Sequence, residues 1–146
     1  MAEFSPLILD TQVWLWTMAG SRDRLTTNAI DEIVACADQG RLFISAISIW
    51  EVAMLEARGR IRMARRIDEW VNEALSAPGT HLLPFSPAIA IESSRLPGPV
   101  HGDPADRMLI ASARVTGGRL ATRDQQIIDY ASEGHLDVLD VGREAS

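Results

Sequence analysis

The sequence has 146 residues, of which 47% are hydrophobic and 23% charged, and a formal net charge of −6. This balance is typical of a globular domain with a sizeable core and excludes a disordered chain. The acidic charge excludes long-range attraction of nucleic acid, so any such binding needs a local basic surface or bound metal ions. We expect a cytoplasmic protein, because Cys36 is the only cysteine and neither a signal-peptide pattern nor a membrane-length apolar run is present.

The first predicted element is the strand Leu7–Leu9, which runs directly into Asp10 and Thr11. A short run of consecutive apolar residues is typical of a strand buried in the middle of a parallel sheet. Asp10 would then lie at the carboxyl end of that strand, where open α/β sheets bind their ligands. The alternative is that Asp10 only caps the helix that follows, because aspartate favours N-cap positions.

The rest of the chain alternates between helices and strands, as apolar spacing and glycine stop signals indicate. We predict helices over residues 11–19, 26–39, 48–57, 67–75, 87–94, 104–116 and 125–131, and strands over residues 42–45, 81–85, 119–122 and 136–141. Alternation of this kind predicts right-handed crossovers and a parallel sheet. The expected fold is α/β, a three-layer α/β/α sandwich in which residues 1–146 form a single domain.

Glu51 has both a structural and a functional interpretation. Ser48 followed three residues later by Glu51 matches a capping box, in which both side chains bond backbone amides at the start of a helix. That box would explain Glu51 by itself. It would also direct the Glu51 side chain back toward the end of the preceding strand, where an active-site acid belongs.

Two more acids lie at comparable points near the C-terminus. Asp103 followed by Pro104 is the pattern of an N-cap and a first helical residue, which places Asp106 in the first turn of its helix. Asp124 follows directly after the predicted strand 119–122. Both Asp106 and Asp124 are therefore expected at the same edge of the sheet as the acid after the first strand.

This edge of the sheet would bring four carboxylates together. They are Asp10, Glu51, Asp106 and Asp124. Carboxylates that lie close together repel one another, and a hard divalent cation, Mg²⁺ or Mn²⁺, is the natural compensation. Such a cage suits phosphodiester hydrolysis, because the metal activates water and stabilises charge on the phosphoryl oxygens.

The motifs that carry these acids resemble those of PIN-domain ribonucleases, and most closely the VapC-type toxins of bacterial toxin–antitoxin pairs. In family order they are Leu-Asp10-Thr11, Ser48-Ile-Trp-Glu51-Val, His101-Gly-Asp103-Pro-Ala-Asp106-Arg-Met-Leu-Ile-Ala and Leu120-Ala-Thr122-Arg-Asp124. The resemblance implies catalytic roles for all four acids, with Asp10 and Asp106 as metal ligands. It also implies an endoribonuclease that depends on Mg²⁺, forms a homodimer and is inhibited by a cognate VapB-type antitoxin.

Several residues near these motifs have more than one interpretation. Asp103 matches an acid of one branch of the family, so it is an N-cap or a secondary acid. Possible RNA contacts are His101, Arg107 and Arg123, although the arginines could equally pair with neighbouring acids. The five arginines between Arg58 and Arg66 form a solvated face, contact RNA phosphate or dock an acidic partner.

The apolar residues between positions 26 and 75 exceed what one small core face needs, which predicts the antitoxin-binding surface there. Four tryptophans could stack on bases, but their helical spacing is more typical of core or dimer interface. They are Trp14, Trp16, Trp50 and Trp70.

Two alternative functions stay open at this point. One is a phosphoryl-transfer domain with Asp10 as nucleophile, but the chain has no lysine, which receiver domains use. Haloacid-dehalogenase-type phosphatases need a second aspartate where Gln12 stands, and dinucleotide binding needs a glycine-rich turn at the same point. The other alternative is a catalytically inactive PIN-like interaction module, which would show no stabilisation by Mg²⁺.

Overall fold

The computed structural model describes residues 5–100 and 102–143, without the side chain of Arg22. Its centre is a parallel sheet with the strand order β3-β2-β1-β4-β5. The strands are β1 (Leu7–Leu9), β2 (Leu42–Ser45), β3 (Thr80–Leu83), β4 (Arg119–Thr122) and β5 (Asp137–Asp140). The chain builds outward from β1 to β3 on one side and from β4 to β5 on the other, so the strand order reverses between β1 and β4. Ligand sites of open α/β sheets form at such a reversal.

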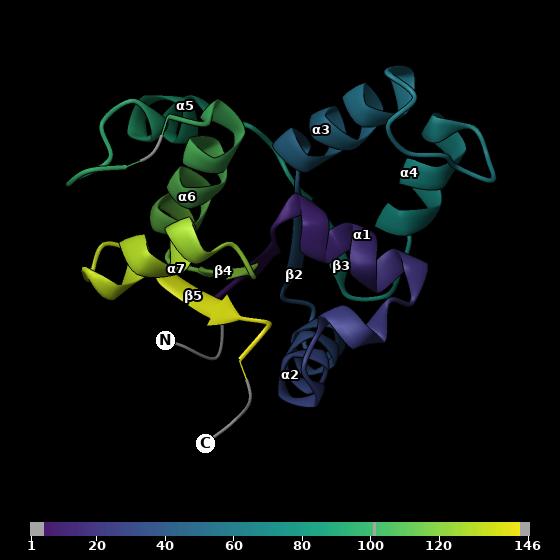
Figure 1. The fold of residues 1–146 in the computed structure, drawn as a ribbon, viewed down its shortest axis with the longest axis horizontal. Helices are drawn as coiled ribbons and strands as arrows, with labels where there is room; N and C mark the ends of the chain where they lie inside the picture. The colour runs from purple at the N-terminus through teal and green to yellow at the C-terminus, as the bar shows by residue number, and fades with distance from the viewer. Residues whose placement is uncertain (1–4, 101, 144–146) are drawn as a thin grey trace.

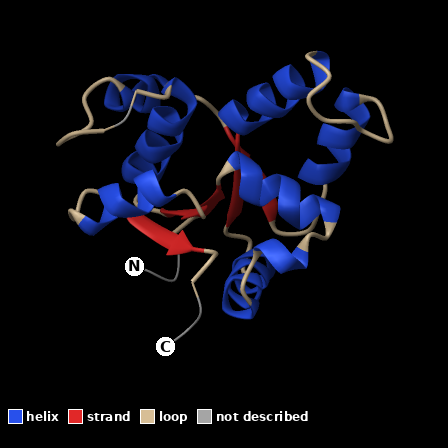
Figure 2. Ribbon diagram, viewed as in Figure 1, coloured by secondary structure: helices blue, strands red, loops and turns tan. Residues whose placement is uncertain are grey.

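Helices cover both faces of the sheet and give the predicted three layers (Figure 2). They are α1 (Thr11–Ala19), the short 3₁₀ helix η2 (Arg22–Arg24), α2 (Thr27–Asp38), α3 (Ala46–Ala57), α4 (Ile67–Leu75), α5 (Pro87–Ser93), α6 (Pro104–Thr116) and α7 (Gln125–Ser132). Apart from η2, which was not predicted, every element lies within two residues of its predicted bounds. No helix within the described ranges is long and apolar enough to cross a membrane.

The core divides into two clusters because successive side chains of β1 point to opposite faces of the sheet. Leu7 and Leu9 lie in the cluster that also holds Trp14 of α1 and the buried residues of α2. Ile8 lies in the other cluster, with Ile110 of α6 and the buried residues of α7. All three β1 side chains are buried, which confirms the prediction that this strand lies in the middle of the sheet.

The start of α3 corrects the capping-box prediction for Ser48 and Glu51. Ser45, the last residue of β2, is the N-cap of α3, and its Oγ accepts a hydrogen bond of 3.0 Å from the amide of Ile47. The helix therefore begins directly after the strand, without a loop between them. Ser48 and Glu51 fall in the first and second turns of α3, so neither side chain caps this helix.

Candidate active site

The carboxyl ends of β1 and β4 border a cavity of about 480 Å³. Its lining residues are Asp10, Thr11, Gln12, Trp16, Glu51, Leu55, Asp106, Arg123 and Asp124. The amino ends of α1, α3, α6 and α7, which carry or follow the four predicted acids, face one another near the centre of Figure 1. The structure therefore brings all four acids to one cavity, from four separate segments of the chain.

Asp10 precedes α1, but its side chain makes no capping hydrogen bond. Its Oδ2 instead accepts a hydrogen bond of 2.8 Å from Thr122 Oγ1 at the end of β4. Burial raises the pKa of Asp10 to about 6, together with the charges of Asp106 and Asp124 and against the opposing effect of the Thr122 hydroxyl. The Asp10 side chain therefore does not cap α1, and its role as an acid of a ligand site stays a prediction.

Glu51 is held by a hydroxyl from another helix. Thr11 Oγ1 lies 2.5 Å from Glu51 Oε1 and 2.8 Å from Ser48 Oγ. A threonine hydroxyl carries a single proton and an ionised carboxylate can only accept, so Thr11 donates to Glu51 and accepts from Ser48. Burial raises the pKa of Glu51, the Thr11 hydrogen bond lowers it, and the charges of Asp10, Asp106 and Asp103 raise it.

The acids near the C-terminus combine helix capping with a place beside the cavity. Asp103 Oδ1 accepts from the amide of Asp106 at 3.0 Å, which confirms the N-cap prediction for Asp103. Asp103 does not line the cavity, whereas Asp106, in the first turn of α6, does. Asp124 lines the cavity and caps α7, with Oδ1 accepting from the amide of Gln126 at 2.8 Å.

Thr122 is the residue of this site that sequence reasoning missed. Its hydroxyl donates to Asp10 and accepts from the amide of Asp124 at 3.1 Å, so one buried side chain links the two acids that follow β1 and β4. The one available signal was its place in the motif before Asp124. Its partner Asp10 lies 112 residues away in sequence, and only the pairing of β1 with β4 brings the two together.

Of the two arginines predicted to contact RNA, one lines the carboxylate cavity and the other does not. Arg123 lines the cavity, and its guanidinium also donates to the carbonyl oxygen of Arg24 at 3.0 Å. Arg107 does not line the cavity, because its Nε donates to the carbonyl oxygen of Ser93 at 3.0 Å. His101 lies outside the described residues. Their contacts with RNA stay predictions.

The donor chemistry of the cavity fits a hard divalent cation. Carboxylate oxygens are the ligands that such a cation prefers. The negative charges of Asp106 and Asp124 raise the pKa of Asp10, and a bound cation would offset this repulsion. Among residues 5–100 and 102–143, no three acidic, histidine or cysteine side chains are arranged closely enough to form a ready metal cage.

Comparisons with known proteins agree with this fold. Residues 7–133 match the family model of the PIN domain. Over 121 residues the chain is 32% identical to Ribonuclease VapC22 of Mycobacterium tuberculosis, a match that covers 83% of this chain and 88% of that protein. The chain belongs to the PIN domain family, in its VapC-type branch.

Solved structures share the fold at low sequence identity. VapBC2 from Rickettsia felis, bound to a DNA fragment from its promoter, matches with a TM-score of 0.66 and 15% identity, over 91% of this chain and 96% of that one. A toxin–antitoxin complex from Klebsiella pneumoniae matches with a TM-score of 0.62 and 20% identity, over 95% of this chain and 99% of that one. Both support the three-layer architecture with its parallel sheet.

Proposed function

We propose that this chain is a metal-dependent endoribonuclease and the toxin of a type II toxin–antitoxin pair. The observation that carries the proposal is the meeting of four carboxylates at one cavity, where burial and mutual repulsion raise the pKa of Asp10 and Glu51. The VapC-type relative is named a ribonuclease, and the structural neighbours named above are toxin–antitoxin complexes. An inactive interaction module would gain nothing from buried acids that repel one another.

The four acids and the hydroxyl groups that bond two of them would have different roles in cleavage. Asp10 and Asp106 would hold the metal, with Glu51 and Asp124 as the other catalytic acids. Bound Mg²⁺, or Mn²⁺, would activate a water molecule and stabilise charge on the phosphoryl oxygens. Thr122 fixes the carboxylate of Asp10 by its hydrogen bond, and the Thr11 hydroxyl does the same for Glu51. Arg123, at the cavity wall, would contact a phosphate of the RNA backbone.

The same proposal extends to partners and organisation. We assign residues 1–146 to a single cytoplasmic PIN domain that forms a homodimer and binds a VapB-type antitoxin. Trp14 and Trp70 pack against each other with ring centroids 5.0 Å apart, so these two tryptophans belong to the core. Trp50 of α3 and Val34 of α2 are more than half exposed, at 57% and 52%. They leave apolar surface on the segment 26–75, where we propose that the antitoxin docks.

RNA cleavage by the purified chain tests the proposal. Asp10→Asn, Glu51→Gln and Asp106→Asn should each abolish cleavage in Mg²⁺ without unfolding the protein, and the wild type should be inactive in EDTA. Asp38→Asn is a matched control, because Asp38 is exposed at the end of α2, away from the cavity. Full activity in any of the three cavity variants, or loss of its fold, would remove that acid from the proposed site.

A further inference from the structure

A second cavity, of about 370 Å³, adjoins the carboxylate cavity along α1. Its lining residues are Gln12, Leu15, Trp16, Met18, Ala19, Ile61, Arg62, Met63, Ala64, Arg65 and Trp70. Gln12 and Trp16 line both cavities, so a chain-like ligand could pass from one to the other. We call this second cavity the α1 groove.

One side of the α1 groove belongs to the most basic segment of an acidic protein. Residues 58–66 hold five arginines and no acid, in a chain of net charge −6. Arg65 pairs with Glu69 and Glu73, and Arg66 pairs with Asp68. Two of the five guanidinium groups are therefore paired with carboxylates.

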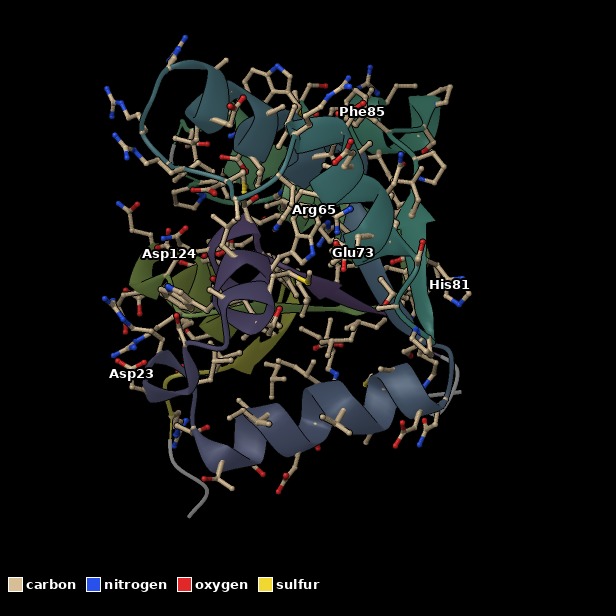
Figure 3. All side chains as sticks on the ribbon, turned by 90° about the vertical axis from the view of Figure 1, so that its right-hand side faces the viewer. Asp23, Arg65, Glu73, His81, Phe85 and Asp124 are labelled. Carbon is tan, nitrogen blue, oxygen red and sulfur yellow. The ribbon has the colours of Figure 1, made fainter. Side chains whose placement is uncertain are left out.

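Three guanidinium groups of this segment stay without such partners. Within the described part of the chain, the side chains of Arg58, Arg60 and Arg62 have no ion pair or hydrogen bond. The loop between α3 and α4 extends past α1 with nitrogen-bearing side chains directed outward (Figure 3). Arg62 also lines the groove, which places an uncompensated positive charge at its rim.

The inner wall of the α1 groove is apolar and aromatic. Leu15, Ile61 and Met63 line it, and Met18 is 41% exposed there. Trp16 is half-buried, and the guanidinium of Arg24 lies 5.8 Å from the centre of its ring. An aromatic and apolar wall beside the unpaired guanidinium of Arg62 suits an unpaired nucleotide, since the base can contact the wall and the phosphate the arginine.

We propose that the α1 groove binds an unpaired nucleotide of the RNA substrate next to the bond that is cleaved. The base lies against Trp16 and the apolar side chains, and Arg62 contacts the adjoining phosphate. The shared wall at Gln12 and Trp16 connects this nucleotide to the phosphate in the carboxylate cavity. A peptide with acidic and apolar side chains could contact the same groups, but the wall shared with the carboxylate cavity favours a nucleotide. The inference rests on the proposed ribonuclease function.

Binding of a labelled single-stranded oligoribonucleotide of mixed sequence tests this, measured by fluorescence anisotropy in Ca²⁺. Arg62→Gln should weaken binding about 5- to 10-fold and lower the salt dependence by about one phosphate contact. Arg60→Gln is the matched control, because it removes an equally unpaired charge from the same segment but lies outside the groove. Ala19→Trp, at an exposed position that lines the groove, should weaken binding by obstructing it.

The outcomes separate this inference from the proposed function. Equal losses in Arg62→Gln and Arg60→Gln would reduce the effect to overall charge and overturn the inference. It would also be overturned if Arg62→Gln weakened binding of the cognate antitoxin but not of RNA, because the groove would then be a protein-docking site. If the wild type cleaves RNA and both groove variants cleave it with the same KM, only the inference about the groove is contradicted. A wild type that neither binds nor cleaves RNA contradicts the proposed function itself.

Discussion

Thr11 Oγ1 lies 2.5 Å from Glu51 Oε1 and joins the first residue of α1 to the second turn of α3, across a separation of 40 residues. The Thr11 side chain is buried and is itself held by Ser48. Burial raises the pKa of Glu51, and this hydrogen bond is the largest influence that lowers it. Thr11 therefore keeps Glu51 both oriented toward the cavity and more easily ionised.

Removal of this hydroxyl should slow cleavage. Thr11→Val keeps the shape of the side chain but leaves Glu51 without its donor, and a hydrogen bond to a charged group contributes about 1.5–3 kcal/mol, or roughly 10- to 100-fold in rate. Thr11→Ser should retain most of the activity. In a pH–rate profile, the acidic limb should move to higher pH in Thr11→Val only. A limb that stays in place would show that Thr11 does not act through Glu51.

The raised pKa of Asp10 predicts how stability depends on pH in metal-free buffer. The folded protein holds the Asp10 proton up to about pH 6, whereas an unfolded chain releases it near the ordinary aspartate pKa of 3.8. The stabilising contribution of the protonated form is therefore fully present below about pH 4 and is lost as the pH rises through about 6. The full difference corresponds to at most about 3 kcal/mol.

Asp10→Asn should remove this dependence. In EDTA near neutral pH, the variant should unfold at a higher temperature than the wild type, because it lacks the buried charge and keeps an oxygen that can accept from Thr122. The difference should shrink toward about pH 4, where the Asp10 carboxyl is protonated in both the folded and the unfolded wild type. Thermal unfolding across this range, with Asp38→Asn as the control, measures it. A wild type that is more stable than Asp10→Asn at neutral pH in EDTA would contradict the prediction.

The secondary structure was predictable because its signals are local. Leu7–Leu9 is apolar throughout and lies in the middle of the sheet, as expected. Asp103 followed by Pro104 starts α6 as a cap and first residue. Gly117 ends the same helix in the left-handed conformation that glycine adopts without strain. Each of these signals depends only on neighbours within a few residues.

The hydrogen bonds that orient the acids were not predictable, because they join distant segments. Thr122 and Asp10 meet through the pairing of β1 with β4, and Thr11 meets Glu51 through the contact of α1 with α3. The capping-box prediction failed because Ser45 also has the residue type of an N-cap and comes first in the chain. Which of two serines caps a helix depends on where the strand before it ends.

Asp124 should tolerate substitution better than Asp10. The carboxylate of Asp124 already caps α7, and asparagine is as good an N-cap as aspartate, so Asp124→Asn should keep the helix start intact. We propose Asp124 as a secondary metal contact at the edge of the cavity. We therefore expect Asp124→Asn to reduce cleavage less than Asp10→Asn does. Cleavage rates of both variants at saturating Mg²⁺ provide the comparison. A larger loss in Asp124→Asn would reverse the order of the two acids.

Binding of the antitoxin should protect the segment 26–75. This segment carries exposed Val34 and Trp50, and its loop holds arginines that an acidic partner could also contact. Hydrogen exchange of the toxin, alone and with its cognate antitoxin, should show slower exchange in α2, α3 or α4. Protection confined to residues after Pro97 would place the antitoxin on the other side of the fold.

RNA affinity with and without a divalent ion shows whether a metal mediates substrate binding, because a protein of net charge −6 with four acids in its cavity should repel phosphate. Ca²⁺ fills carboxylate sites but supports hydrolysis poorly, so binding can be measured without cleavage by fluorescence anisotropy on labelled RNA. We expect an affinity at least about tenfold higher in Ca²⁺ than in EDTA for the wild type, and little gain for Asp10→Asn. Equal affinity of the wild type in EDTA and in Ca²⁺ would contradict this expectation.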